Sequence, residues 1–82
     1  MSKENQVTIE DAHKLAERFF KEGNLTLAER TYKDILNAVP NDSNSYTHLG
    51  VICYQLGRLE EALEYLQQSV DINPSNPWAM NV

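Results

Sequence analysis

The amino-acid sequence predicts an all-α protein made of antiparallel helix hairpins, with two copies of the hairpin in 82 residues. In four segments, apolar residues recur at the i, i+3, i+4 spacing of a helix face, and no segment has the alternation of a half-buried strand. A glycine or a proline follows each helical segment, as expected where a helix ends. The prediction of two copies comes from an internal repeat, because the sequence aligns with itself after a shift of 34 positions.

The first hairpin is expected to follow a flexible N-terminal tail, residues 1–8, which is mainly polar and has no helical period. Thr8, with Asp11 three residues later, forms a loose capping box at the start of the first helix. This helix is expected to end at Gly23, because glycine adopts the left-handed conformation of a helix C-terminus without a Cβ clash. A second helix is expected to run from Leu25 to a point before Pro40.

The second hairpin repeats this pattern. Asp42 or Ser43 is expected to cap a third helix that ends at Gly57, and a fourth helix is expected to end before Pro74. Asn76 followed by Pro77 is a typical N-cap and first-turn proline, so a fifth helix is expected to start there.

The shift of 34 positions aligns identical residues at positions that a helix hairpin restricts. Ala28 and Ala62 fall where two helices are expected to cross closely, and a larger side chain there would push the helices apart. The same argument applies to the similar pair Ala16 and Gly50. The five identical pairs are Leu15/Leu49, Gly23/Gly57, Leu25/Leu59, Ala28/Ala62 and Pro40/Pro74.

The stretch Tyr46-x-x-Leu49-Gly50-x-x-Cys53-Tyr54-x-x-Gly57-x-Leu59-x-x-Ala62…Pro74 resembles a tetratricopeptide repeat. The resemblance covers a second repeat at residues 43–76, a weaker first repeat at 9–42 and the start of a third at 77–82. Two positions depart from the family pattern, since Ala12 and Cys53 stand where large aromatic residues are usual. The resemblance implies a short right-handed α-solenoid that serves as a protein-interaction module and is not an enzyme.

Three roles are compatible with this resemblance. The first is an adaptor that presents a groove to a partner polypeptide, as the N-terminal part of a longer protein. The second is a self-assembly unit that forms homo-oligomers through its open repeat ends. The third is a targeting arm of a larger transferase-type enzyme, because Asn73-Pro74-x-Asn76-Pro77 also resembles repeats that precede bacterial transferase domains. The number of repeats after Val82 would discriminate among them.

Composition and charge exclude several other classes. The longest apolar run, Val51–Ile52–Cys53, is far too short to cross a bilayer, so we expect a cytoplasmic protein with no membrane partner. A net charge of −5 without any basic cluster disfavours nucleic-acid binding. The sequence has no glycine-rich phosphate loop, nucleophile elbow or HExxH motif, so we expect no catalytic residue and no cofactor.

The tetratricopeptide resemblance implies that the first helix of each hairpin lines a concave groove. In one subclass, lysine, asparagine and arginine side chains of this groove grip a partner's C-terminal carboxylate. The matching positions here include His13, Glu17 and His48, and Glu17 would repel a carboxylate, so this mode is not expected. The predicted groove residues are His13, Lys14, Glu17, Phe20, Lys21, Asn44, Thr47, His48, Val51, Tyr54, Gln55 and Trp78.

Some of these residues allow a second interpretation. His13, Glu17 and His48 could converge on a metal ion, but a fourth ligand is missing, so we expect solvated polar residues and no metal. Phe20 and Tyr54 are expected to be mainly core residues that also form part of the groove floor.

Two further expectations concern packing. Cys53 is expected to be a buried, unreactive thiol without a basic neighbour. Residues 43–57 carry no charged side chain apart from a possible proton on His48, which predicts a middle position in the stack or a neutral groove wall.

The last expectation concerns the C-terminal end of the stack. An apolar strip, formed by residues of the expected third and fourth helices, is expected to be partly exposed to solvent. This strip would bind a second copy, with Trp78 and Met80 at the contact, or would be covered by Trp78 of the same chain. Its expected members are Tyr54, Leu63, Leu66 and Val70.

Overall fold

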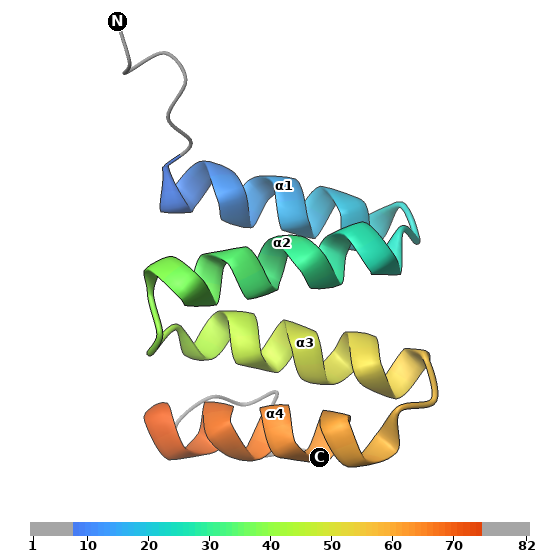
Figure 1. Ribbon diagram of the computed structural model, residues 1–82, viewed down its shortest axis with the longest axis vertical. Helices are drawn as coiled ribbons and strands as arrows, with labels where there is room; N and C mark the ends of the chain where they lie inside the picture. The colour runs from blue at the N-terminus through green and yellow to red at the C-terminus, as the bar shows by residue number, and fades with distance from the viewer. Residues whose placement is uncertain (1–7, 75–82) are drawn as a thin grey trace, which may run out of the picture.

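The computed structural model describes residues 8–74, which form four α-helices. They are α1 (Ile9–Lys21), α2 (Leu25–Ala38), α3 (Ser43–Gln55) and α4 (Leu59–Ile72). The helices lie one above the next in chain order, and each runs antiparallel to the one before it (Figure 1). Within residues 8–74 there is no strand, so the predicted all-α fold is confirmed. In the same range, no helix has the length and apolar character needed to cross a membrane.

The helix boundaries follow local signals in the sequence. Thr8 caps α1, because its Oγ1 accepts a hydrogen bond of 3.0 Å from the backbone N–H of Asp11. Asn24 caps α2 in the same way, with its side-chain oxygen as the acceptor. Gly23 and Gly57 follow α1 and α3 with a φ of 81°, the left-handed region that favours glycine. The predicted helix ends at these two glycines are therefore confirmed.

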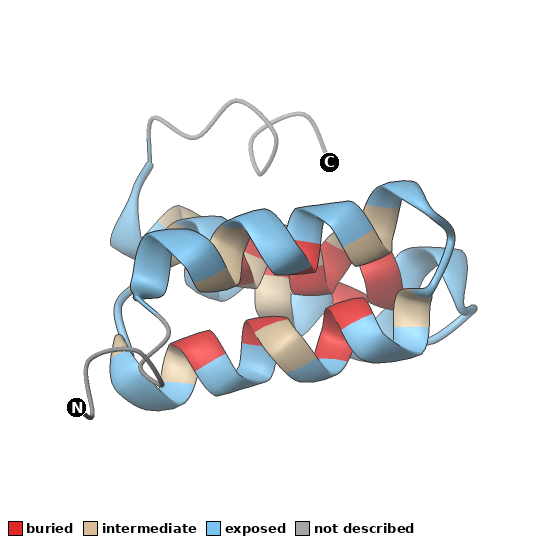
Figure 2. Cartoon of the chain, turned by 90° about the horizontal axis from the view of Figure 1, so that it is seen from above, coloured by how far each residue is buried: buried red, intermediate tan, exposed pale blue. Residues whose placement is uncertain are grey.

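The core lies where the two hairpins meet, and buried residues gather on the sides of the helices that face one another (Figure 2). Helix α3 has six buried residues, against one in α1, because it is packed between α2 and α4. Charged side chains are costly in such a position, which explains the uncharged sequence of this helix. The residues of the central cluster are Ala16, Ala28, Tyr32, Ile35, Leu49 and Ile52.

Gly50 allows α3 and α4 to approach closely. A Cβ atom at this position would lie 2.6 Å from Cγ of Leu66 and 3.3 Å from the backbone oxygen of Ala62. The Leu66 side chain thus fills the space next to Gly50 and is only 7% exposed. The expectation that Leu66 faces solvent is wrong for this reason. Tyr54 and Leu63 do face solvent, with 67% and 63% of their surface exposed.

Residues that are identical in the two hairpins differ in burial. Leu49 is fully buried, whereas the equivalent Leu15 is 42% exposed on the outer side of α1. Likewise, Leu25 is half-buried between helices, whereas the equivalent Leu59 on α4 is 55% exposed. The repeat therefore predicts where a residue lies within its hairpin, while the place of the hairpin in the stack determines what covers it.

Candidate functional site

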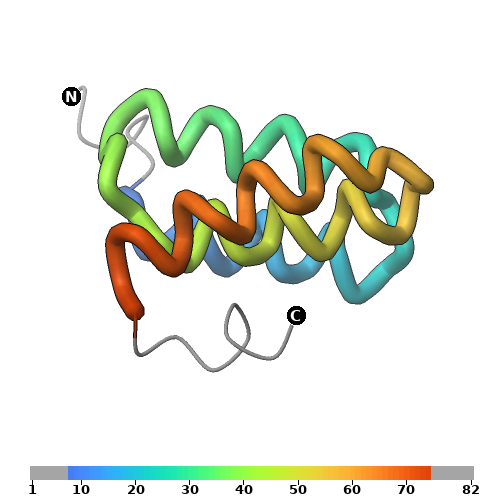
Figure 3. Tube along the Cα trace, turned by 90° about the horizontal axis from the view of Figure 1, so that it is seen from below, coloured from blue at the N-terminus to red at the C-terminus, as the bar shows by residue number. Residues whose placement is uncertain are grey.

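The first helices of the two hairpins, α1 and α3, share one side of the stack, with α2 on the opposite side (Figure 3). Two contacts join them. Nε2 of His13 lies 2.8 Å from Oδ2 of Asp42, the residue that precedes α3. The ring of Phe20 meets the ring of His48 edge to face, with the centroids 6.0 Å apart. We call this surface the α1–α3 face; it comprises His13, Glu17, Phe20, Asn44, His48 and Val51.

The imidazole of His48 is held in one orientation by its neighbours. Its ring stacks on Tyr32 of α2, with the centroids 4.7 Å apart and 14° between the planes. Its Nδ1 lies 2.9 Å from the backbone oxygen of Asn44. Because that carbonyl can only accept, Nδ1 must carry the hydrogen, and Nε2 of the neutral ring is left as an acceptor. A fixed acceptor of this kind can bind a donor without first losing side-chain freedom.

Tyr32 supports the α1–α3 face from below. It is 1% exposed and also meets the ring of His13 edge to face. Burial, and then the nearby carboxylates of Glu17 and Asp42, raise the pKa of Tyr32 well above its ordinary value, so its phenol stays neutral. The two histidines of the face therefore rest on an uncharged aromatic wall. The groove prediction did not include Tyr32, because it belongs to the second helix of its hairpin.

Asp42 occupies the predicted capping position of α3 but makes no side-chain capping bond. Its carboxylate accepts a hydrogen bond from the hydroxyl of Ser45 and contacts the imidazole of His13. The contact with Asp42 explains the position of the His13 imidazole, and this position does not require a metal ion. Within residues 8–74, His13 does not form a group of ligands with Glu17 and His48.

A small hollow lies on the α1–α3 face, and its lining consists of Phe20, Thr47, His48 and Val51. It holds about 60 Å³. Pockets for drug-sized ligands and cofactors hold roughly 300–1,000 Å³, so this hollow fits one small side chain. All four lining residues were predicted for the groove, and the fold brings them together between two helices.

Two of the predicted groove residues differ from expectation in their burial. Thr47 is only 3% exposed, and its hydroxyl pairs with the hydroxyl of Ser69 in α4, so it mainly joins α3 to α4 and reaches only the floor of the hollow. Tyr54 was expected to belong to the core, but it is exposed. The equivalent Phe20 is half-buried because α3 lies beside it, and no helix within residues 8–74 lies beside Tyr54 in the same way.

The remaining predicted groove residues fall into two groups. Trp78 lies outside the described residues. The others are exposed polar or charged side chains, namely Lys14, Glu17, Lys21, Asn44 and Gln55.

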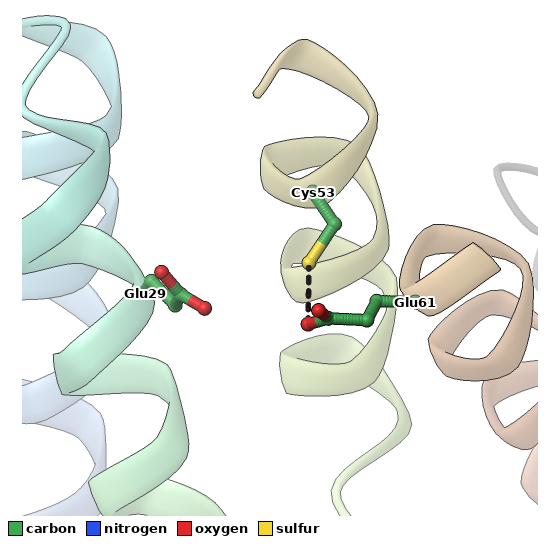
Figure 4. A group of neighbouring side chains, drawn as sticks. All are labelled: Glu29, Cys53 and Glu61. Carbon is green, nitrogen blue, oxygen red and sulfur yellow. Dashed lines mark hydrogen bonds between the residues drawn. The ribbon is translucent and has the colours of Figure 1, made fainter. Parts of the chain in front are cut away.

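A second cluster joins three helices: Glu29 from α2, Cys53 from α3 and Glu61 from α4 (Figure 4). Their ligand atoms all lie within 4.8 Å of one another, close enough for one cation to touch all three. However, Glu29 already contacts Arg58 at 2.8 Å and Lys33 at 3.2 Å, and a metal ion would have to displace these two positive charges. The charges are balanced without a metal, so we interpret the cluster as an ion-pair network that joins the hairpins.

The expectation that Cys53 has no basic neighbour is wrong, since Arg58 and Lys33 both act to lower the pKa of its thiol. Burial and the carboxylates of Glu61 and Glu29 act in the opposite direction and prevail, so the pKa of Cys53 is raised. Nothing in the local sequence predicted this network, because its members are far apart in the chain.

The thiol of Cys53 is expected to be unreactive in the folded protein, because it is buried and protonated and only the thiolate is nucleophilic. A disulfide reagent that releases a chromophore should react quickly with the chain in urea and slowly in buffer. When urea is added to the buffer in steps, the rate of modification should rise over the same urea concentrations at which the chain unfolds. Rapid modification without unfolding would contradict the buried position of the thiol.

Four antiparallel helices arranged as two equivalent hairpins define a helical-repeat protein. A family model described as "Tetratricopeptide repeat" matches residues 13–77. This is more than half of the chain, and the chain therefore belongs to the tetratricopeptide-repeat family. The resemblance in the sequence is thus confirmed. Tetratricopeptide repeats generally mediate interactions between proteins.

Proposed function

We propose that this protein is a protein-interaction module whose α1–α3 face binds an extended segment of a partner polypeptide. The observation that carries the proposal is the hollow between Phe20 and Val51, with the imidazole of His48 fixed beside it. A preformed hollow next to a fixed acceptor lowers the entropic cost of binding.

The partner that fits this face is an extended peptide with one small aliphatic side chain. This side chain would enter the hollow, and a neighbouring peptide N–H would donate to Nε2 of His48. An extended backbone also exposes further N–H and C=O groups that need hydrogen-bond partners. The exposed amides of Asn44 and Gln55 can supply both donors and acceptors. Lys14 and Glu17 place both signs of charge on α1, so we propose no charge preference.

A test can use peptides selected from a random displayed library against the immobilised full chain. Their affinities would be measured by fluorescence anisotropy. Alanine at Phe20, His48 or Tyr54 is expected to weaken binding, by roughly tenfold or more at His48, the loss typical of an interface hot spot. Alanine at Glu64 or Gln67, which are exposed on α4, should leave the affinities unchanged.

His48→Phe is the matched control for the hydrogen bond, because phenylalanine keeps a ring that can stack on Tyr32 and has no Nε2. It should weaken binding while the melting temperature stays near that of the parent. Selected peptides that lose affinity with Glu64→Ala or Gln67→Ala and retain it with His48→Ala would contradict the proposed site and place it on α4.

A further inference from the structure

The outer side of the first hairpin has a hollow between α1 and α2. It holds about 330 Å³, far more than the hollow on the α1–α3 face. At 100° per residue, Thr31 and Ala38 lie on the side of α2 opposite to Glu29 and Leu36, which are directed at the second hairpin. We call the hollow between α1 and α2 the α1–α2 hollow. Its lining includes Ile9, Ala12, Leu15, Thr31, Ile35 and Ala38.

The outer side of the second hairpin carries a ridge instead. Leu59, Leu63 and Val70 fall within about 40° of one another around the axis of α4, so they form one stripe. Leu59 is 55% exposed, Leu63 is 63% exposed and Val70 is half-buried. We call these three residues the α4 ridge. Large exposed apolar side chains in one stripe are typical of an interaction surface.

The repeat shows that ridge and hollow occupy positions that contact each other inside the chain. Shifted back by 34 positions, the α4 ridge corresponds to Leu25, Glu29 and Leu36 of α2. All three are covered in the structure: Glu29 is 8% exposed, and the two leucines pack against the central cluster.

The same relation holds for the hollow. Shifted forward by 34 positions, Ala12, Leu15 and Thr31 correspond to Tyr46, Leu49 and Tyr65, on the side of the second hairpin that faces α2. Leu49 is fully buried and Tyr65 packs against the central cluster. The contact between the two hairpins therefore continues, position by position, from the α4 ridge to the α1–α2 hollow.

The residues that differ between these equivalent surfaces change in a complementary way. Inside the chain, the rings of Tyr46 and Tyr65 lie 6.2 Å apart and occupy the space opposite α2. Ala12 and Thr31 stand in their places on the first hairpin, and their smaller side chains leave the hollow open. On the opposite surface, Leu63 takes the place of the charged Glu29. A deeper apolar hollow is thus matched by a more apolar ridge.

We propose that two copies of this chain associate head to tail, with the α4 ridge of one copy in the α1–α2 hollow of the next. The contact would use the register in which α2 packs against the second hairpin. It is heterologous, so each pair still offers one ridge and one hollow, and further copies can add. The α1–α3 face stays uncovered, and its hollows would lie in a row along the assembly.

Charge favours this arrangement over a symmetric contact between two α4 helices. Helix α4 carries Glu60, Glu61, Glu64 and Asp71 and has no lysine or arginine, so two such surfaces would repel each other. The lining of the α1–α2 hollow has one charged residue, Asp34, and helix α1 has equal numbers of acidic and basic residues, so α4 meets less negative charge there than on a second α4.

Sedimentation equilibrium of the full chain over a wide concentration range tests the proposal. The average mass is expected to rise with concentration. Leu63→Lys on the ridge, and Ala12→Tyr with Thr31→Tyr in the hollow, should each raise the concentration of half-association by roughly tenfold or more. Leu56→Lys makes the same change at a leucine outside the ridge and should have little effect. Circular dichroism would confirm that each variant remains helical.

Mixing the variants gives the sharper result. The Leu63→Lys chain keeps an intact hollow, and the chain with two added tyrosines keeps an intact ridge. An equimolar mixture should form a dimer that does not grow further, while each variant alone stays monomeric. A parent chain that is monomeric at all concentrations would overturn the proposal. So would association that the two tyrosines do not weaken, as in a contact between two α4 helices, or a mixture that stays monomeric. Affinity for peptides selected on the α1–α3 face should be unchanged in these variants, so the two proposals can fail separately.

Discussion

Replacement of Gly50 by leucine is expected to lower the melting temperature by roughly 5–20 °C, since overpacking costs about 1–3 kcal/mol and small domains lose about 4–8 °C per kcal/mol. The reason is the close approach of α3 and α4, in which even a Cβ atom would lie 2.6 Å from Cγ of Leu66. Ala62→Leu, on the other side of the same contact, should have a similar effect because Ala62 is 3% exposed. Thermal unfolding followed by circular dichroism measures both.

A double-mutant cycle with Gly50→Ala and Leu66→Ala identifies the cause. In an exposed helix, glycine to alanine stabilises by about 1 kcal/mol. In the parent chain the clash with Leu66 should cancel or reverse that gain, and in the Leu66→Ala chain the gain should reappear. The expected coupling is about 0.5–3 kcal/mol in the free energy of unfolding. Equal effects of Gly50→Ala in both backgrounds would mean that Leu66 does not restrict this position.

Tyr32→Ala is expected to cost about 3–5 kcal/mol, the usual range for truncation of a buried aromatic side chain. Tyr32 is 1% exposed, belongs to the central cluster and stacks on His48, so its loss opens a cavity at the junction of the two hairpins. Natural domains have only about 5–15 kcal/mol of total stability, so the variant should be partly unfolded at room temperature.

Tyr54→Ala is the matched control for Tyr32→Ala. Tyr54 is 67% exposed, so its truncation should change the free energy of unfolding by no more than about 0.5 kcal/mol. Urea unfolding measures both variants on one scale. If both variants lost a similar free energy of unfolding, Tyr54 would have to be covered in solution. That result would contradict the difference in burial between Tyr32 and Tyr54.

The helix boundaries could be predicted from the sequence because their causes are local. Glycine accepts the positive φ at positions 23 and 57, and Thr8 reaches the N–H of a residue three positions away. The repeat of 34 positions added the pairing of helices, because small residues recur where helices cross. It also placed Phe20 and His48 on the first helices of the hairpins, and their contact in the structure agrees with that placement.

Other features depended on contacts between residues far apart in the chain, which no local pattern encodes. Glu29 contacts Arg58, 29 positions away, and the hydroxyls of Thr47 and Ser69 pair across 22 positions. Burial likewise depends on which helix lies alongside, and Leu15 and Leu49 differ in exposure for this reason although their local sequences predict the same role. The sequence by itself thus determined the helices, the hairpins and the family. The tertiary structure alone decided which side chains are covered, which neighbours fix His48, and where apolar surface is left exposed, because each of these is set by packing between helices.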